Sequence, residues 1–235
     1  MSDPAASAPL VLVALRERAT TPAGDRALLV DAVAEATGVA PTEVEVTQWC
    51  ARCGGDHGRP ILVRCGERGT DGIDLSLSRA GRSVAIAVSF AGPVGIDIES
   101  VAAASRSGFD DVAFGRAELD RLATDGSPAL RTVMWTAKEA VLKATGHGLR
   151  VDPREIEVSL ADRMPDDSAH PADPAHPDDS AHPADPTIVA WSSAPVPLRS
   201  FRLSAFDSGP GLVGTVAVIA DVRPEIRMLT PAAHT

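Results

Sequence analysis

Two short stretches of the chain carry acidic and basic side chains at spacings that could do chemistry. In the first, residues 135–148, apolar residues recur at helical spacing, which predicts a helix over about 130–145. Glu139 and Lys143 stand four residues apart and therefore lie on the same side of that helix. A carboxylate and an ammonium held together can bind a metal, move a proton, or form an ordinary surface ion pair.

The second stretch, residues 94–99, has the pattern of an apolar strand that carries two carboxylates. Alternation along a strand puts Asp97 and Glu99 on one face, opposite the isoleucines. Two such neighbours repel each other unless a cation lies between them, and carboxylate oxygens suit magnesium. With Glu139 they would make three acidic donors, and Lys143 could bind the anion held by the metal. The alternative is a pair of solvated acids at an exposed strand end.

The two stretches together resemble the 4'-phosphopantetheinyl transferase superfamily, and the joint spacing of the motifs is more specific than either motif alone. The matching residues are Gly95-Ile96-Asp97-Ile98-Glu99, Phe114, Glu118, Trp135-Thr136, Lys138-Glu139-Ala140, Lys143, Gly146 and Gly148-Leu149. The resemblance is to the longer, monomeric, two-lobed type that is similar to the surfactin-synthetase-activating enzyme. It covers the middle of the chain.

The resemblance implies an α+β fold of two similar lobes, a pseudo-dimer with antiparallel sheets, packed helices and an active site between the lobes. We expect an N-terminal lobe over 1–98 that contacts coenzyme A and the carrier. A C-terminal lobe over 99–222 would hold the metal and the catalytic helix, and 223–235 would be a tail. Periodicity by itself supports only an α+β fold with antiparallel hairpins.

The implied reaction transfers the 4'-phosphopantetheine arm of coenzyme A to a serine of an apo acyl, polyketide or nonribosomal-peptide carrier protein and releases 3',5'-ADP. In this scheme Asp97, Glu99 and Glu139 would hold Mg²⁺. Glu139 is the candidate base for the serine proton, directly or through a water, and Lys143 would stabilise developing charge. Asp97, Glu139 and Lys143 form the expected catalytic set. Such enzymes serve fatty acid or secondary metabolite biosynthesis.

Basic and hydroxyl side chains complete the implied coenzyme A site. The expected contacts are Arg26, Arg59, Ser78, Arg79, Lys138 and Lys143. Arg59 stands where the family has the lysine of a Gly-Lys-Pro sequence, and Arg79 stands where the family has a histidine. Because arginine does not lose its proton, an acid–base role at position 79 is in doubt, while phosphate binding is preserved.

Two alternatives remain open. One is a catalytically inactive relative that binds coenzyme A or a protein partner. The chain retains every acidic and basic residue of the chemical core, which argues against this alternative. The other is a magnesium-dependent nucleotide hydrolase, which is disfavoured because the chain has no glycine-rich phosphate loop of the P-loop type.

The three cysteines cluster with a histidine. Cys50, Cys53, His57 and Cys65 could supply four zinc ligands, although the later spacings match no common zinc motif. The alternative is reduced, unligated thiols, as expected in a cytoplasmic protein.

A proline- and aspartate-rich segment interrupts the second half. Residues 165–174 are repeated identically as 177–186, without a large apolar residue, which predicts a disordered insertion in a hairpin loop. This segment contributes six of the ten net negative charges of the chain. Its histidines could bind a metal, but solvated histidines are the simpler interpretation.

The composition of the chain argues against several classes of protein. The hydrophobic content of 44% is that of a globular protein with a real core. The chain has no basic run and no tyrosine, so no nucleic-acid-binding surface is indicated. No apolar run is long enough to span a membrane, and the first nine residues lack the features of a signal peptide, so we expect a cytoplasmic protein.

The remaining elements follow from local patterns. We expect helices over 27–36 and 109–123, with Glu118 in a structural role. The expected strands are 10–15, 44–46, 61–63, a hairpin of 73–80 with 83–89, then 154–160, 188–191, 201–206 and 211–222.

Overall fold

The computed structural model describes residues 9–50, 54–55, 58–103, 108–160 and 185–230, which form a mixed α+β structure with several antiparallel sheets. The strands are β1 (Leu10–Glu17), β2 (Val44–Trp49), β3 (Arg59–Cys65), β4 (Asp74–Ala80), β5 (Ser83–Ser89), β6 (Val94–Ser100), β7 (Glu157–Leu160), β8 (Pro186–Ala190), β9 (Phe201–Phe206), β10 (Leu212–Ile219) and β11 (Glu225–Leu229). The α-helices are α1 (Pro22–Thr37), α2 (Phe109–Ala113), α3 (Arg116–Asp125) and α4 (Pro128–Ala144). Short 3-10 helices are η1 (Pro41–Glu43), η2 (Gly148–Arg150), η3 (Pro153–Glu155) and η4 (Leu198–Ser200).

The two halves of the chain use the same order of elements. In the first half, β1 is followed by α1, the hairpin β2-β3, and then β4 and β5. In the second half, β6 is followed by α4, the hairpin β7-β8, and then β9 and β10, with α2 and α3 placed ahead of α4. In both halves the first strand pairs with the last, giving the strand orders β11-β1-β5-β4 and β6-β10-β9.

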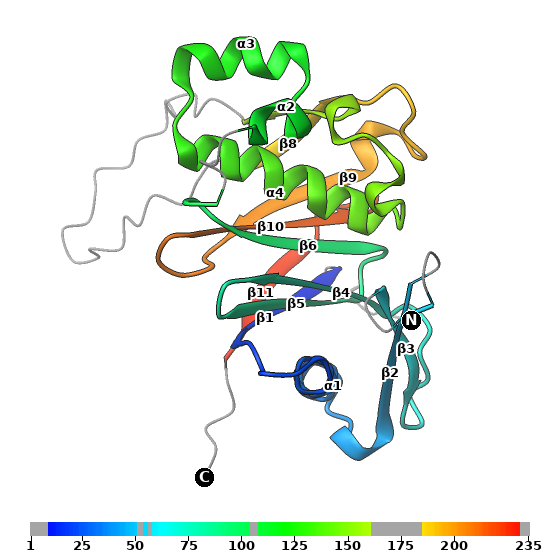
Figure 1. Ribbon diagram of the computed structural model, residues 1–235. Coiled ribbons are helices and arrows are strands. Elements are labelled where there is room, and N and C mark those ends of the chain that lie inside the picture. The colour runs from blue at the N-terminus through cyan, green and yellow to red at the C-terminus, as the bar shows by residue number, and fades with distance from the viewer. Residues whose placement is uncertain (1–8, 51–53, 56–57, 104–107, 161–184, 231–235) are drawn as a thin grey trace, which may run out of the picture.

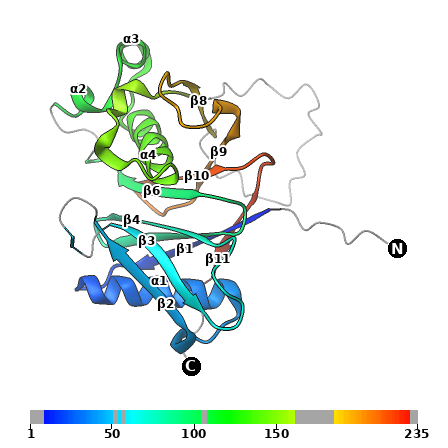
Figure 2. The same cartoon turned by 90° about the vertical axis from the view of Figure 1, so that its right-hand side faces the viewer.

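These elements stack in layers (Figure 1; Figure 2). Helix α1 covers the outer face of the four-stranded sheet around Leu29 and Val33, and α4 covers the outer face of the three-stranded sheet around Val141. The inner faces of the two sheets pack against each other through a cluster that includes Val13 and Ile96. Burial of apolar surface between all four layers drives the assembly.

Strand β6 lies at the edge of its sheet, and side chains from β4 cover that edge. Three alternate residues of β4, Asp74, Ser76 and Ser78, face β6, and we call them the polar seam. Asp74 Oδ2 accepts a hydrogen bond from the Val94 backbone N–H (2.7 Å), and Ser76 Oγ accepts one from the Ile96 N–H (3.0 Å). The seam therefore satisfies edge donors that would otherwise be buried without partners, and it joins the two halves.

Gly95 explains how closely α4 approaches β6. A Cβ atom at this position would lie 1.8 Å from the Ala140 carbonyl oxygen and 2.6 Å from the Ala144 nitrogen. No other residue fits there without moving the helix, because both of those atoms are backbone atoms. Gly95 thus sets the distance between the strand and the helix that carry the candidate catalytic residues.

Helix α4 confirms the helix predicted over 130–145. It begins two residues earlier because the Ser127 hydroxyl accepts a hydrogen bond from the Leu130 N–H (3.2 Å) and Pro128 occupies the first turn. Helix α1 likewise begins before the predicted 27–36, since Thr21 caps it through the Gly24 N–H (3.1 Å).

The single helix predicted over 109–123 is wrong, because α2 and α3 are separate helices. The break falls at Phe114, whose extended backbone lets its side chain enter the core with 1% exposure. At Gly115 a Cβ atom would lie 2.8 Å from the Arg154 carbonyl oxygen, and the Gly115 N–H donates to Glu118 Oε2 (3.0 Å), which starts α3. Burial of Phe114 therefore overrides the local helical pattern.

The prediction that residues 223–235 are a tail is also wrong. Residues 225–229 form β11, which pairs in parallel with residues 10–14 of β1. The last strand of the chain thus returns to the sheet of the first half, so a boundary at residue 222 does not end the folded protein. The partial burial of Ile226 against the cluster between the sheets accounts for this return.

Strands β7 and β8 pair in an antiparallel hairpin, with Leu160 opposite Pro186, so the segment between them connects two neighbouring strands. Residues 161–184, which include most of the predicted insertion 165–186 and all its histidines, lie outside the described residues. In the described part of the chain, no helix is both long enough and apolar enough to cross a membrane.

Candidate active site

The centre of the candidate site is Asp97, which β6 presents to α4. The Lys143 ammonium donates one hydrogen bond to Asp97 Oδ1 (2.6 Å) and another to the Ile96 carbonyl oxygen (3.0 Å). The Asp97 side chain is 4% exposed and that of Lys143 is 28% exposed. The sequence prediction places both residues in one site but assigns Lys143 to an anion, whereas in the structure Lys143 pairs with Asp97 itself.

A third contact to Asp97 comes from the first half of the chain. The Ser78 hydroxyl, on β4, donates to the same Oδ1 atom (2.7 Å). Asp97 Oδ2 is also buried, yet it has no hydrogen-bond partner among the residues that the structure describes. A buried acceptor without a partner costs about 1–3 kcal/mol. Such an atom can accept a hydrogen bond from a water or bind an ion.

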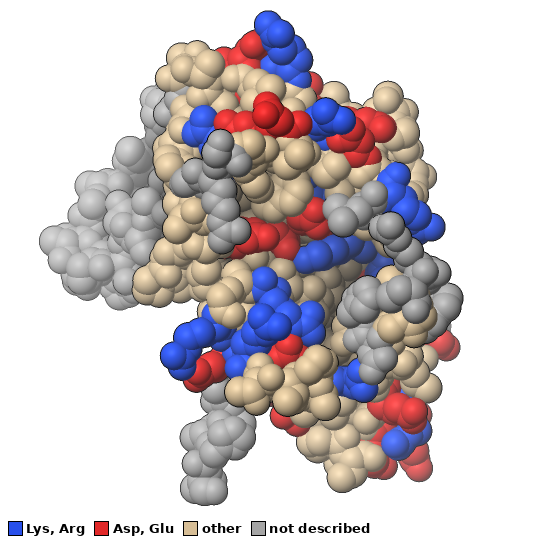
Figure 3. Space-filling model, in the orientation of Figure 1, with Lys and Arg blue, Asp and Glu red and all other residues tan. Residues whose placement is uncertain are grey.

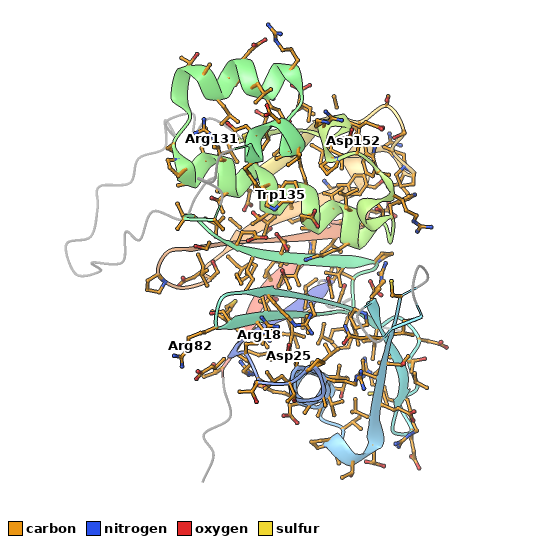
Figure 4. The ribbon with its side chains drawn as sticks, viewed as in Figure 1. Arg18, Asp25, Arg82, Arg131, Trp135 and Asp152 are labelled. Carbon is orange, nitrogen blue, oxygen red and sulfur yellow. The ribbon has the colours of Figure 1, made fainter. Side chains whose placement is uncertain are left out.

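Glu99 and Glu139 lie close enough to Asp97 for the three carboxylates to act on one another. Burial first, and then the Asp97 charge, raise the pKa of Glu99, while Lys143 and a hydrogen bond from the Trp135 side chain oppose the rise. Burial first, and then Asp97, raise the pKa of Glu139 to about 7, with Glu99 adding to the rise and Lys143 opposing it. Figure 4 shows Trp135 on α4, above the sheets.

The donor set has the chemistry of a magnesium site, although its side chains are not gathered around one point. Within the described ranges, no group of three His, Cys, Asp or Glu side chains is close enough to hold a metal ion. In the structure Lys143 is the cation nearest the Asp97 carboxylate. Mg²⁺ usually keeps several waters and takes one or two carboxylates. Asp97 Oδ2 together with Glu99 or Glu139 fits that requirement.

Arg59 lies beside this site and bridges the two halves. It forms an ion pair with Asp74 of the polar seam, and its guanidinium donates to the carbonyl oxygens of Lys143 (3.2 Å) and Ala144 (3.5 Å). A cation on the last carbonyls of a helix stabilises its C-terminus. The structure therefore gives Arg59, expected as a phosphate contact, a role in capping α4 next to Lys143.

Arg79, another predicted basic contact of the first half, pairs with Asp25 on α1. Asp25 is 2% exposed, and its Oδ2 pairs with Arg79 (2.5 Å) and Arg18 (3.7 Å). Arg26 follows Asp25 on the same helix. Figure 4 shows Arg18 and Asp25 in the lower half, and Figure 3 shows basic side chains gathered beside and below acidic ones in the middle of this face. A buried carboxylate thus holds guanidinium groups near the surface.

Lys138, predicted to contact phosphate, lies outside the site. Its side chain is fully buried and donates to the Ala113 carbonyl oxygen (2.7 Å) and to Glu118 Oε2 (2.5 Å). Burial lowers the pKa of Lys138, and the Glu118 carboxylate opposes that shift. Glu118 Oε1 also accepts from the Val158 N–H (2.9 Å), so the pair joins α2, α3, α4 and β7. The structural role expected for Glu118 agrees with these contacts.

Cys65 does not share a site with Cys50. It lies opposite Val44 at one end of the β2-β3 hairpin, whereas Cys50 follows the other end, so about six residues, or roughly 20 Å, separate them. Cys65 is buried, and its Sγ lies 3.7 Å from Thr37 Oγ1. Cys53 and His57, the other candidate zinc ligands, lie outside the described residues.

Sequence reasoning missed three of these contacts: Ser78 with Asp97, Trp135 with Glu99, and Arg59 with the end of α4. Only the contact of Trp135 with Glu99 had a local signal. Trp135 stands one helical turn before Glu139, so the two residues lie on the same side of α4. The Ser78 contact joins strands of two different sheets, and the Arg59 contact joins β3 to the end of α4. No spacing within one element reveals either contact.

A comparison with protein families agrees with the geometry. Residues 93–177 match the family model of the 4'-phosphopantetheinyl transferase superfamily. This span is less than half of the chain and contains β6 and α4, hence the three carboxylates and Lys143, but not Arg59 or Ser78. The chain thus carries a segment similar to transferases of this superfamily, which take coenzyme A as substrate. No curated protein matches the chain.

Proposed function

We propose that the protein transfers the 4'-phosphopantetheine arm of coenzyme A to a serine of an apo acyl or peptidyl carrier protein and releases 3',5'-ADP. The observation that carries this proposal is that Asp97 pairs with Lys143 between β6 and α4 and lies near enough to Glu99 and Glu139 to raise their pKa values, inside the segment that matches the superfamily. Adjacent carboxylates with a lysine suit a reaction that must neutralise phosphate charge and activate a hydroxyl.

In the proposed reaction the carrier serine oxygen forms a bond to the β-phosphorus of coenzyme A. The bond from that phosphorus to the bridging oxygen breaks, and the oxygen leaves with 3',5'-ADP. Glu139 takes the serine proton, directly or through a water. Lys143, with 28% exposure, donates to the phosphate oxygens as charge builds on them.

Magnesium is part of the proposal. Asp97, Glu99 and Glu139 are the residues that would hold it, and the ion would polarise the pyrophosphate of coenzyme A. Without the ion, Lys143 and Ser78 share Asp97 Oδ1, which leaves Oδ2 as the available acceptor. Trp135 holds the Glu99 carboxylate through its hydrogen bond.

The first half of the chain is proposed to bind the nucleotide of coenzyme A through Arg26, Arg59 and Arg79. The pairing of Arg79 with the buried Asp25 supports this because it holds a guanidinium near the surface. The equal order of elements in the two halves supports two similar lobes with the site between them, as in the longer, monomeric type of the superfamily.

The test is the intact mass of apo carrier proteins of fatty-acid, polyketide and peptide type, incubated with the protein, coenzyme A and magnesium, with an EDTA control. We expect a gain of one phosphopantetheine group on a carrier, only with metal, and no gain with Glu139→Gln. Coenzyme A binding without any transfer would favour an inactive relative. Release of 3',5'-ADP without a carrier would favour a hydrolase.

A further inference from the structure

We infer that Ser78 is a positioning residue that orients the Asp97 carboxylate for a divalent cation, and that it does not contact coenzyme A. The inference rests on the proposed function in one respect, because it takes Asp97 as part of the cation site. Its structural basis is the hydrogen bond from the Ser78 hydroxyl to Asp97 Oδ1, at 2.7 Å.

Both ends of this hydrogen bond are withdrawn from solvent. Ser78 is 7% exposed and Asp97 is 3% exposed, and the single hydroxyl hydrogen of Ser78 is used in this contact. A phosphate could receive that hydrogen only if Asp97 lost it. The geometry therefore favours the carboxylate as the partner of Ser78.

The contact makes the two Asp97 oxygens different. Oδ1 accepts from Ser78 and from Lys143, whereas Oδ2 accepts from no residue in the described part of the chain. A carboxylate with both donors on one oxygen is fixed in rotation and presents its other oxygen for a ligand. Hydrogen bonds of this kind to a metal-binding carboxylate tune its orientation and its affinity.

The polar seam supplies a control for this role. Ser76 and Ser78 are both buried serines on the same strand, two residues apart, and both face β6. The Ser76 hydroxyl, however, accepts a hydrogen bond from the Ile96 N–H (3.0 Å), so it holds backbone, and among the described residues it has no hydrogen bond to a carboxylate. Removal of the Ser78 hydroxyl takes a hydrogen bond from the Asp97 carboxylate, whereas removal of the Ser76 hydroxyl takes one from the Ile96 N–H.

The test compares Ser78→Ala, Ser78→Thr and Ser76→Ala with the unsubstituted full-length protein. Mn²⁺, which replaces Mg²⁺ at oxygen ligands, is the probe, and electron paramagnetic resonance counts the free ion, first without and then with coenzyme A. We expect about tenfold weaker Mn²⁺ binding in Ser78→Ala, unchanged binding in Ser76→Ala, and recovery in Ser78→Thr, which keeps the hydroxyl. Thermal melting confirms that each variant is folded.

A second measurement separates positioning from direct contact. Calorimetry of coenzyme A binding in EDTA should give the same affinity for Ser78→Ala and the unsubstituted protein. Loss of coenzyme A affinity with unchanged Mn²⁺ affinity would overturn the inference in favour of a direct contact, and equal Mn²⁺ affinity in all variants would overturn it as well. If the unsubstituted protein binds no Mn²⁺ under either condition, the inference fails, while the carrier mass measurement still decides the proposed transfer.

Discussion

Replacing Glu139 with glutamine should change how the stability of the fold depends on pH. Burial and the neighbouring carboxylates raise the pKa of Glu139 from 4.5 to about 7 in the folded protein. A carboxyl group whose pKa is raised by folding contributes stability that is fully present below its unfolded value and lost as pH rises through the folded value. The folded protein binds the extra proton between these two values, so the free energy of unfolding falls across that window.

The size of the effect follows from the shift. Each unit of pKa corresponds to about 1.4 kcal/mol, so the rise from 4.5 to about 7 corresponds to about 3 kcal/mol. Glutamine keeps the shape of the side chain but has no charge to bury. The Glu139→Gln variant should therefore gain about 3 kcal/mol relative to the unsubstituted protein between pH 4 and pH 9.

Urea unfolding at unit steps of pH, in EDTA, measures this difference. Glu67→Gln, which removes a carboxylate from the exposed turn after β3, controls for the change in net charge. A constant difference between Glu139→Gln and the unsubstituted protein over the whole pH range would refute the reasoning, since it would mean that folding does not raise the pKa of Glu139.

Three further changes test the packing around the site. Lys138→Met should lower the free energy of unfolding by about 3–5 kcal/mol in urea, because it leaves the Glu118 carboxylate buried without its cation, and adding Glu118→Gln should recover part of the loss. Gly95→Ala should cost about 3 kcal/mol, because the added Cβ overlaps the backbone of α4; an unchanged unfolding midpoint would contradict the close approach. The Cys65 thiol, at 0% exposure, should react with a thiol reagent only as fast as the protein unfolds.

The parts of the structure that sequence predicted well are those whose signal is local. The helical spacing of apolar residues located α4, and alternation in β6 put Asp97 on the face opposite Ile96, which lies in the cluster between the sheets. Both signals act within one element. They are therefore independent of how the sheets later pack.

The two lysines of α4 show where such reasoning ends. Lys138 and Lys143 both lie between the apolar residues of α4, and a lysine side chain is by default expected to be exposed to solvent. Five residues rotate a helix by about 140°, so the two ammonium groups point in different directions. Lys143 faces β6, whereas Lys138 faces Phe114 and Glu118, and only the folded structure places an acid where burial of a lysine becomes possible.

Contacts between distant segments could not be predicted from the sequence for a similar reason. β11 pairs with β1 from the other end of the chain, and Ser78 meets Asp97 across two sheets. Neither contact belongs to a repeating pattern in one element. They depend on how the two halves pack together, which the apolar cluster between the sheets determines as a whole.

The site makes the fold less stable than an apolar equivalent would be, and a divalent cation should reverse this. Asp97 Oδ2 is buried without a partner among the described residues, and burial raises the pKa values of Glu99 and Glu139. A cation must displace the proton from Glu139 in order to use that carboxylate. Proton and cation therefore compete below a pH of about 7.

This competition predicts how cation binding depends on pH. Displacement of one proton from a group with a pKa of about 7 makes Mn²⁺ binding about tenfold weaker at pH 6 than at pH 8. In Glu139→Gln the affinity should be lower and nearly independent of pH over that range, because the proton that competes is gone. A similar pH dependence in both proteins would show that Glu139 is not a ligand, and would leave Asp97 and Glu99 as the residues that hold the ion.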